Sequence, residues 1–248
     1  MSTKCLCSGV PLGPSTSSNC KNQFGCQQSC PDFSIKRHDT KPAFRVEVDD
    51  CDGPIDFTDP NLVLETNMWA EGKLKASIDA YATSFAFADN IGFNQIRAGD
   101  VLVMVRTRNP EYMLVVGFDE ENYLVEVERG YFNTPVGAWA KGNHIKIFRI
   151  MNGIGSIETD TQDIVQEDGT TLKDQIVSTN LVYEWQAADT CLPGCYFFEF
   201  KMLKMLDYVG SYSADEHSSG LGVEWTRRFP LQEKGFSIQI IDTQTAEL

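Results

Sequence analysis

The stretch Val125–Arg149, VEVERGYFNTPVGAWAKGNHIKIFR, decides the fold of the central part of the chain. Valine and glutamate alternate up to Arg129 and Gly130, and in the second half Ile145 and Ile147 alternate with polar residues. A period of two is typical of a strand that buries one face, and the glycines and asparagines between the two runs favour a turn. The stretch therefore predicts two strands joined by a polar connection.

The residues before and after this stretch repeat the same pattern. Short turns rich in Gly, Asn, Pro and Asp separate four segments with strand character, which are Asp100–Val105, Glu111–Asp119, Tyr123–Gly130 and His144–Ile150. Within them, Val101–Val105 and Met113–Val116 are continuously apolar, which is typical of strands covered on both faces. We therefore expect a small barrel-like β domain.

Strand patterns also flank this central unit, and neither flank has sustained helical periodicity. Apolar and polar residues alternate in Phe44–Val48 on one side and in Cys195–Met205 on the other. The sequence thus predicts an all-β protein. We expect an Ig-like antiparallel β-sandwich built from residues 33–88 and 169–248, with the small β domain, residues 89–168, inserted between them.

The chain has 248 residues and a formal net charge of −14, from 35 acidic and 21 basic residues. Nucleic acids and anionic membranes bind clustered Lys and Arg, so this charge argues against both as partners. The N-terminus lacks the apolar run of an export signal, and no segment approaches the roughly 18 apolar residues of a membrane span. We therefore expect a soluble protein that is made in the cytoplasm.

Few residues have the spacing that catalysis or metal binding requires. His38, His144 and His217 lie far apart in polar surroundings, which is more typical of surface or turn positions. The loop Asp49–Gly53 offers oxygen ligands for Ca²⁺, but no glutamate follows at the spacing of a calcium loop, so a solvated turn is favoured. No phosphate-binding glycine loop, nucleophile elbow or HExxH motif occurs. The sequence predicts neither an enzyme nor a bound cofactor or metal.

Residues 1–32 are rich in Gly, Ser, Pro, Asn and Cys and lack apolar periodicity, so we expect an irregular Cys-rich arm. The cysteines of this arm lack the paired CxxC spacing of zinc sites. A second Cys pair flanks a Leu-Pro-Gly turn and is a candidate for a local bridge. Disulfides formed after release from the cell, reduced thiols and a metal site stay open as alternatives. The candidates for a disulfide or cross-link are Cys5, Cys7, Cys20, Cys26, Cys30, Cys191 and Cys195.

The C-terminal third has aromatic and turn residues in a recognisable order: Tyr183, Trp185, Asp189, Thr190, Pro193, Gly194, Tyr196, Glu199, Phe200, Phe229 and Pro230. In this order they resemble the baseplate-upper-protein N-terminal-like β-sandwich of tailed-phage structural proteins, and the run Phe33–Trp69 is similar to the start of that domain. By chemistry alone, Tyr183 and Trp185 share one strand face and fill a core, whereas the Asp-Thr and Pro-Gly pairs favour turns.

The central unit has a second pattern: Gly99, Asp100, Glu111, Met113, Val115, Val127, Arg129, Gly130, Thr134, Gly142 and Ile145. It resembles a pattern of phage virion proteins. The two resemblances together span most of residues 33–241, and they imply that the small β domain is an insertion into the sandwich. Neither family is known for an active site.

The resemblances imply a structural component of a tailed-bacteriophage virion, made in the host cytoplasm, which docks on the baseplate or neck. Edge strands, loops and the arm would connect it to neighbouring subunits or fibres, so its partners would be other phage structural proteins and further copies of itself. A receptor- or glycan-binding module at a fibre base is the alternative. A depolymerase, a third class, would need two carboxylates converging in a cleft.

Candidate partner contacts for the first two classes lie in the connection between the two central strands. They are Arg129, Tyr131, Phe132 and Trp139. An arginine suits a protein surface, and aromatic rings stack on sugars. The same aromatic residues also suit a cover over the mouth of the small barrel.

Overall fold

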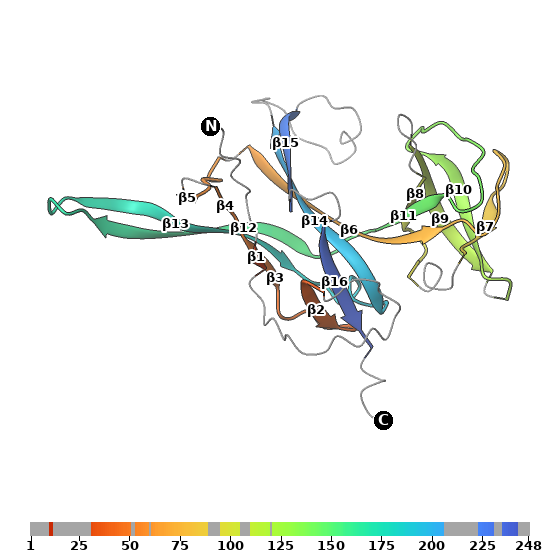
Figure 1. Ribbon diagram of the computed structural model, residues 1–248, viewed down its shortest axis with the longest axis horizontal. Coiled ribbons are helices and arrows are strands. Elements are labelled where there is room, and N and C mark those ends of the chain that lie inside the picture. Colours follow the sequence, from red (N-terminus) through yellow and green to blue (C-terminus); the bar gives the residue numbers. More distant parts are fainter. Residues whose placement is uncertain are drawn as a thin grey trace, which may run out of the picture.

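The computed structural model describes residues 10–11, 31–50, 53–59, 61–88, 95–104, 110–119, 121–205, 223–230 and 235–242. These residues contain strands, turns and bends but no helix, which confirms the all-β prediction (Figure 1). Nearly all of the expected arm, residues 1–32, lies outside the described part of the chain.

The first eight strands are β1 (Val10–Pro11), β2 (Phe33–Lys36), β3 (Phe44–Glu47), β4 (Asp49–Asp50), β5 (Gly53–Pro54), β6 (Leu62–Lys73), β7 (Ser84–Ala86) and β8 (Val101–Met104). The others are β9 (Glu111–Asp119), β10 (Leu124–Tyr131), β11 (His144–Arg149), β12 (Ile154–Val165), β13 (Thr171–Glu184), β14 (Gly194–Met205), β15 (Val223–Phe229) and β16 (Phe236–Ile241).

Two sheets pack together as the predicted sandwich. One has the order β1-β3-β13-β12, and the facing layer has the order β2-β16-β14-β6, with β15 also paired to β14. Aromatic rings from both layers fill the space between them: the ring of Phe44 lies 5.2 Å from that of Phe198 and 5.3 Å from that of Phe236. Tyr183 and Trp185 are fully buried in the same cluster, as their spacing predicted.

The small β unit continues the second layer in the order β6-β11-β8-β9-β10-β7. It closes on itself because Leu74, just after β6, bridges Phe87, just after β7, and the Ala88 N–H donates to the Lys73 carbonyl at 2.7 Å. This closure is the expected barrel-like arrangement. Strand β8 is covered on both faces, as predicted, but β9 is not, because Val116 is 54% exposed.

The stretch Val125–Arg149 forms most of β10 and all of β11, which confirms its two predicted strands. They are not neighbours in the sheet: β10 pairs with β9 and β7, whereas β11 pairs with β6 and β8. The connection between them therefore crosses from one side of the barrel to the other instead of forming a tight hairpin. Gly130, the last residue but one of β10, lies at a register shift and has a φ of 68°, a conformation that glycine adopts without steric cost.

The expected limits of the inserted domain are residues 89 and 168. The strand pairing places the limits of the barrel elsewhere. Strand β7 lies before residue 89 but belongs to the barrel, and β12 lies before residue 168 but pairs with β13 in the sandwich. The reason is that β12 and β13 form one hairpin, so β12 lies in the same sheet as its partner. Strand β6 belongs to both units, because its first part pairs with β14 and its last part with β11.

The hairpin of β12 and β13 extends far beyond the rest of its sheet, on the side opposite to the barrel (Figure 1). Strand β3 pairs with β13 only over residues 180–183, so the outer part of the hairpin is a two-stranded ribbon. Every residue from 160 to 174 is exposed. This outer part, residues 160–174, is called the hairpin tip below.

Candidate functional site

A buried ion pair lies under the connection that the sequence singled out. Glu111 opens β9 and is completely buried, and the side chain of Arg129, near the end of β10, is 6% exposed. Arg129 Nε donates to Glu111 Oε1 at 2.5 Å, and Arg129 Nη2 donates to Oε2 at 2.9 Å. This two-bond geometry matches the planar guanidinium to the carboxylate, the strongest arrangement for such a pair.

The remaining polar atoms of this pair are also bonded. Glu111 Oε2 accepts from Trp139 Nε1 at 2.6 Å and from the Gly137 N–H at 3.1 Å. Arg129 donates to the carbonyls of Asp79, Ala82 and Gly137 at 3.0, 2.9 and 2.6 Å. Burial alone raises the pKa of Glu111, but the hydrogen bonds from Arg129, Trp139 and Gly137 outweigh it, so the net pKa is lowered. The network fastens the connection to the barrel.

The four predicted partner contacts are therefore in different places. Arg129 and Trp139 lie inside the barrel, where Trp139 covers the core as the second interpretation of the aromatics expected. Tyr131 is half-buried, and Phe132 is 59% exposed. Partner contact remains a prediction for Tyr131 and Phe132.

An aromatic patch surrounds Phe132 at this end of the barrel. The rings of Tyr131 and Phe132 are 4.2 Å apart, and that of Tyr112 lies 5.9 Å from Phe132. Tyr112 pairs with Tyr131 across β9 and β10. The sequence did not reveal Tyr112 because only the register between the strands brings it to the other two rings.

A second polar network lies where the barrel meets the sandwich. Arg149, at the end of β11, is buried and donates to the carbonyls of Asp189 and Gln95 and to the hydroxyl of Tyr196 at 3.2, 3.0 and 3.1 Å. Burial raises the pKa of Tyr196 to about 12, although the charge of Arg149 opposes the shift. Arg149 thus ties the last strand of the barrel to the sandwich.

The Asp189 carboxylate is the acceptor in the same network. It accepts from the Tyr183 hydroxyl at 2.9 Å, the Gln186 N–H at 2.9 Å and the Asn152 N–H at 2.7 Å. The sequence predicted turn chemistry for Asp189, and the bond to Gln186 is of that kind. The bonds to Tyr183 and Asn152 join distant segments, which spacing along the chain does not reveal.

Asp100 and Arg97 extend this junction. Asp100 is completely buried, and its carboxylate accepts from the Arg97 N–H at 3.0 Å and from Arg97 Nε at 3.3 Å. Burial raises the pKa of Asp100, and the charges of Arg149 and Arg97 only partly oppose this shift. Arg97 also donates to the carbonyls of Ala188 and Ile150. These charges hold backbone segments together.

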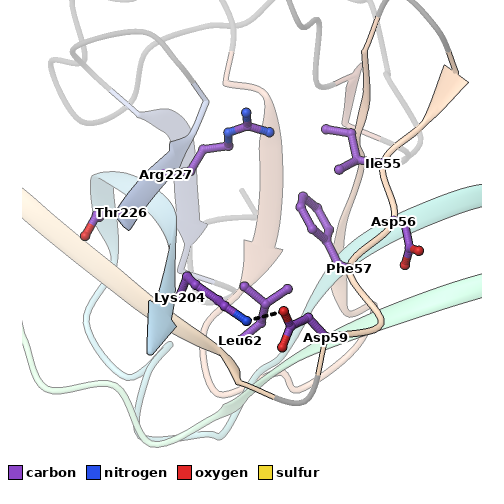
Figure 2. A pocket seen from close by; sticks show the side chains of 8 residues that line it. All are labelled: Ile55, Asp56, Phe57, Asp59, Leu62, Lys204, Thr226 and Arg227. Atoms are coloured by element: carbon purple, nitrogen blue, oxygen red, sulfur yellow. Dashed lines mark hydrogen bonds and ion pairs between the residues drawn. The ribbon is translucent and has the colours of Figure 1, made fainter. Parts of the chain in front are cut away.

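A pocket of about 570 Å³ opens between β15 and the segment that follows β5 (Figure 2). Its lining residues are Ile55, Asp56, Phe57, Asp59, Leu62, Lys204, Thr226 and Arg227. Arg227 faces Ile55 and Phe57 across the space (Figure 2). Lys204 forms an ion pair with Asp59 at the base of the pocket. We call it the β15 pocket; the sequence did not predict it, because its residues come from three distant segments.

The bonding of Cys191 and Cys195 differs from the local bridge that their spacing suggested. Cys191 is a free thiol, whereas Cys195 is disulfide-bonded, so the candidate local bridge between the two does not form. Arg97 Nη1 approaches the Cys191 sulfur at 3.9 Å instead. The disulfide partner of Cys195 lies outside the described residues. The arm candidates, Cys5, Cys7, Cys20, Cys26 and Cys30, also lie outside them.

In the described part of the chain, no three His, Cys, Asp or Glu side chains gather to hold a metal ion. The same residues include no helix long and apolar enough to cross a membrane. Comparison with protein-family models finds no family that matches the chain, and comparison with curated proteins finds no significant match.

Proposed function

We propose that the protein is a non-enzymatic structural component of a tailed-bacteriophage virion, which joins neighbouring subunits or fibres at the baseplate or neck. The observation that carries this proposal is the hairpin tip. A two-stranded ribbon is at best marginally stable alone in water, because it has no second layer on which to bury a face. A chain that extends such a ribbon from a well-packed sandwich has a segment suited to complete its packing on another chain.

The use of the charged groups supports an assembly role. Glu111 and Arg129 satisfy each other, and Arg149 donates to backbone carbonyls and Tyr196. A catalytic acid or base must be accessible to the substrate, whereas these groups are bonded to one another and to the backbone. Their chemistry suits a rigid scaffold, which holds exposed strands and loops in place for partners.

The proposal is tested by immunogold labelling of intact phage particles with antibodies raised against the purified protein. We expect gold at the tail end or neck of the particle. Antibodies absorbed beforehand with the purified protein serve as the control. Particles that carry no specific label would contradict a virion role.

The aromatic patch favours a second candidate, a glycan-binding module. Tyr112, Tyr131 and Phe132 form a group of rings with an exposed member, and exposed aromatic faces stack on sugars. The test is binding of the purified protein to a glycan array, with Phe132→Ala as the variant. Tyr81→Ala is the matched control, because Tyr81 is 90% exposed in the same unit but lies outside the patch. Equal binding by the two variants would argue against this role.

A further inference from the structure

The hairpin tip exposes apolar side chains. Ile164, Val165 and Leu172 are 44%, 68% and 37% exposed. Ile164 and Leu172 pair directly across the two strands, so their side chains lie on the same face. Val165, next to Ile164, projects from the opposite face. Both faces of the ribbon thus offer apolar surface that nothing in the described part of the same chain covers.

The hairpin tip is also strongly acidic. Its acidic residues are Asp160, Asp163, Glu167, Asp168 and Asp174, and its basic residue is Lys173. Five negative charges against one positive charge give the tip a formal charge of −4. A partner surface that accepts it must therefore combine apolar contacts with positive charge.

The β15 pocket offers apolar walls and one cation without an ion pair among the described residues. Its lining also holds Asp59, which pairs with Lys204, and Asp56, which accepts from the N–H and the hydroxyl of Thr58. Ile55, Phe57 and Leu62 give it apolar walls, and Arg227 reaches over it from β15 (Figure 2). Arg227 is exposed and has no ion pair with any residue that the structure describes. The neighbouring Arg228 is exposed as well, but it pairs with Glu199 at 3.8 Å, so Arg227 is the cation that remains for a partner.

The hairpin tip and the β15 pocket lie apart in the fold. The hairpin tip points away from the sandwich, whereas β15 lies beside β14 over the sandwich itself (Figure 1). A hairpin held by β13 to β3 cannot turn back to β15. The tip of one copy is therefore available to the pocket of another.

We propose that the hairpin tip of one copy docks in the β15 pocket of a second copy of this chain. The inference rests on the proposed assembly role and names a partner for it. Ile164, Val165 or Leu172 contacts Ile55 and Phe57, while tip carboxylates pair with Arg227. Because the two surfaces differ, the contact is head-to-tail, and repeating it produces a closed ring or an open filament.

The test is sedimentation velocity of the purified full-length chain over a range of concentrations, with and without reductant. We expect the wild-type protein to self-associate under both conditions, and high salt to weaken the association. Val165→Asp in the tip and Arg227→Glu in the pocket should each weaken it by about tenfold or more. Ile154→Asp and Arg228→Glu are matched controls, because Ile154 is 63% exposed at the base of the hairpin and Arg228 alternates with Arg227 on β15.

Mixing the two variants provides the sharper result. The Val165→Asp chain keeps an intact pocket, and the Arg227→Glu chain keeps an intact tip, so one head-to-tail contact can form between them. We expect heterodimers in the mixture at concentrations at which neither variant alone associates detectably. A monomeric wild-type protein, or variants that associate like the wild type, would overturn the docking proposal. Gold label on particles would still support the virion role in that case, so the two failures are distinguishable.

Discussion

Replacing Glu111 with glutamine removes one charge from the buried pair while preserving the shape of the side chain. In the wild-type protein the carboxylate accepts four hydrogen bonds, two from Arg129 and one each from Trp139 and Gly137. A glutamine whose oxygen takes the place of Oε2 keeps three of them. Its amide nitrogen then meets Arg129 Nε, so two donors face each other.

The expected cost comes mainly from Arg129. Its guanidinium remains buried at 6% exposure but no longer has a negative partner. Removing one member of a buried ion pair typically costs about 3–5 kcal/mol, and the retained hydrogen bonds place this variant near the lower end, at about 3 kcal/mol.

The assay is urea unfolding followed by tryptophan fluorescence, which responds to Trp139 in the same network. Glu158→Gln is the matched control. Glu158 pairs with Arg45 at the surface, where the side chains are 46% and 38% exposed, so its loss should cost less than about 1 kcal/mol. Equal costs for Glu111→Gln and Glu158→Gln would refute the reasoning that burial makes the first pair important.

Three further outcomes follow from the same structure. The pKa of Glu111 is lowered in the folded state, so the contribution of its carboxylate to stability is complete above the ordinary pKa of 4.5 and is lost as the pH falls through the lowered pKa. In urea titrations below that lowered pKa, the stability difference between wild type and Glu111→Gln should shrink. Gly153→Ala should destabilise by several kcal/mol in the same titration at neutral pH, because an added Cβ would lie 2.1 Å from the Glu184 carbonyl oxygen; an unchanged midpoint would contradict this geometry. Tyr183→Phe leaves Asp189 without one of its donors and should cost about 1–3 kcal/mol, seen as a lower midpoint for thermal unfolding by circular dichroism.

The strands could be predicted where one face is buried. Alternation in β3 and β14 and the two-residue spacing of Tyr183 and Trp185 arise because side chains that share a face meet the same core. The sequence also indicated that a strand ends near Arg129 and Gly130; β10 continues to Tyr131, and Gly130 lies within it, at a register shift, with a φ of 68°.

The site partners could not be predicted in the same way. Arg129 meets Glu111 because β9 and β10 pair with register shifts, one of which lies between Arg129 and Tyr131. A single bulge changes which face each later side chain occupies, and alternation within one strand does not reveal it. Phe132 and Trp139 both lie in the connection after β10, yet Phe132 is exposed and Trp139 is buried.

The hairpin tip escaped prediction for a different reason. Residues 160–174 are exposed on both faces, so no buried face imposes a period of two on them. The expected domain limit at residue 168 fell at its turn, between β12 and β13. Because the hairpin tip packs on no other part of the described chain, no buried face imposes a repeating pattern on its sequence.

Strand β6 has a mechanical consequence, because it runs unbroken from the sandwich into the barrel. Eight residue pairs join it to β14, and a further set joins its last part to β11. Hydrogen bonds between antiparallel strands lie perpendicular to the strand axis. A pull on the barrel along β6 therefore loads these bonds in shear and all at once, instead of opening them one after another. Strand β6 therefore couples the two units mechanically, and barrel and sandwich should respond to force as one stiff unit.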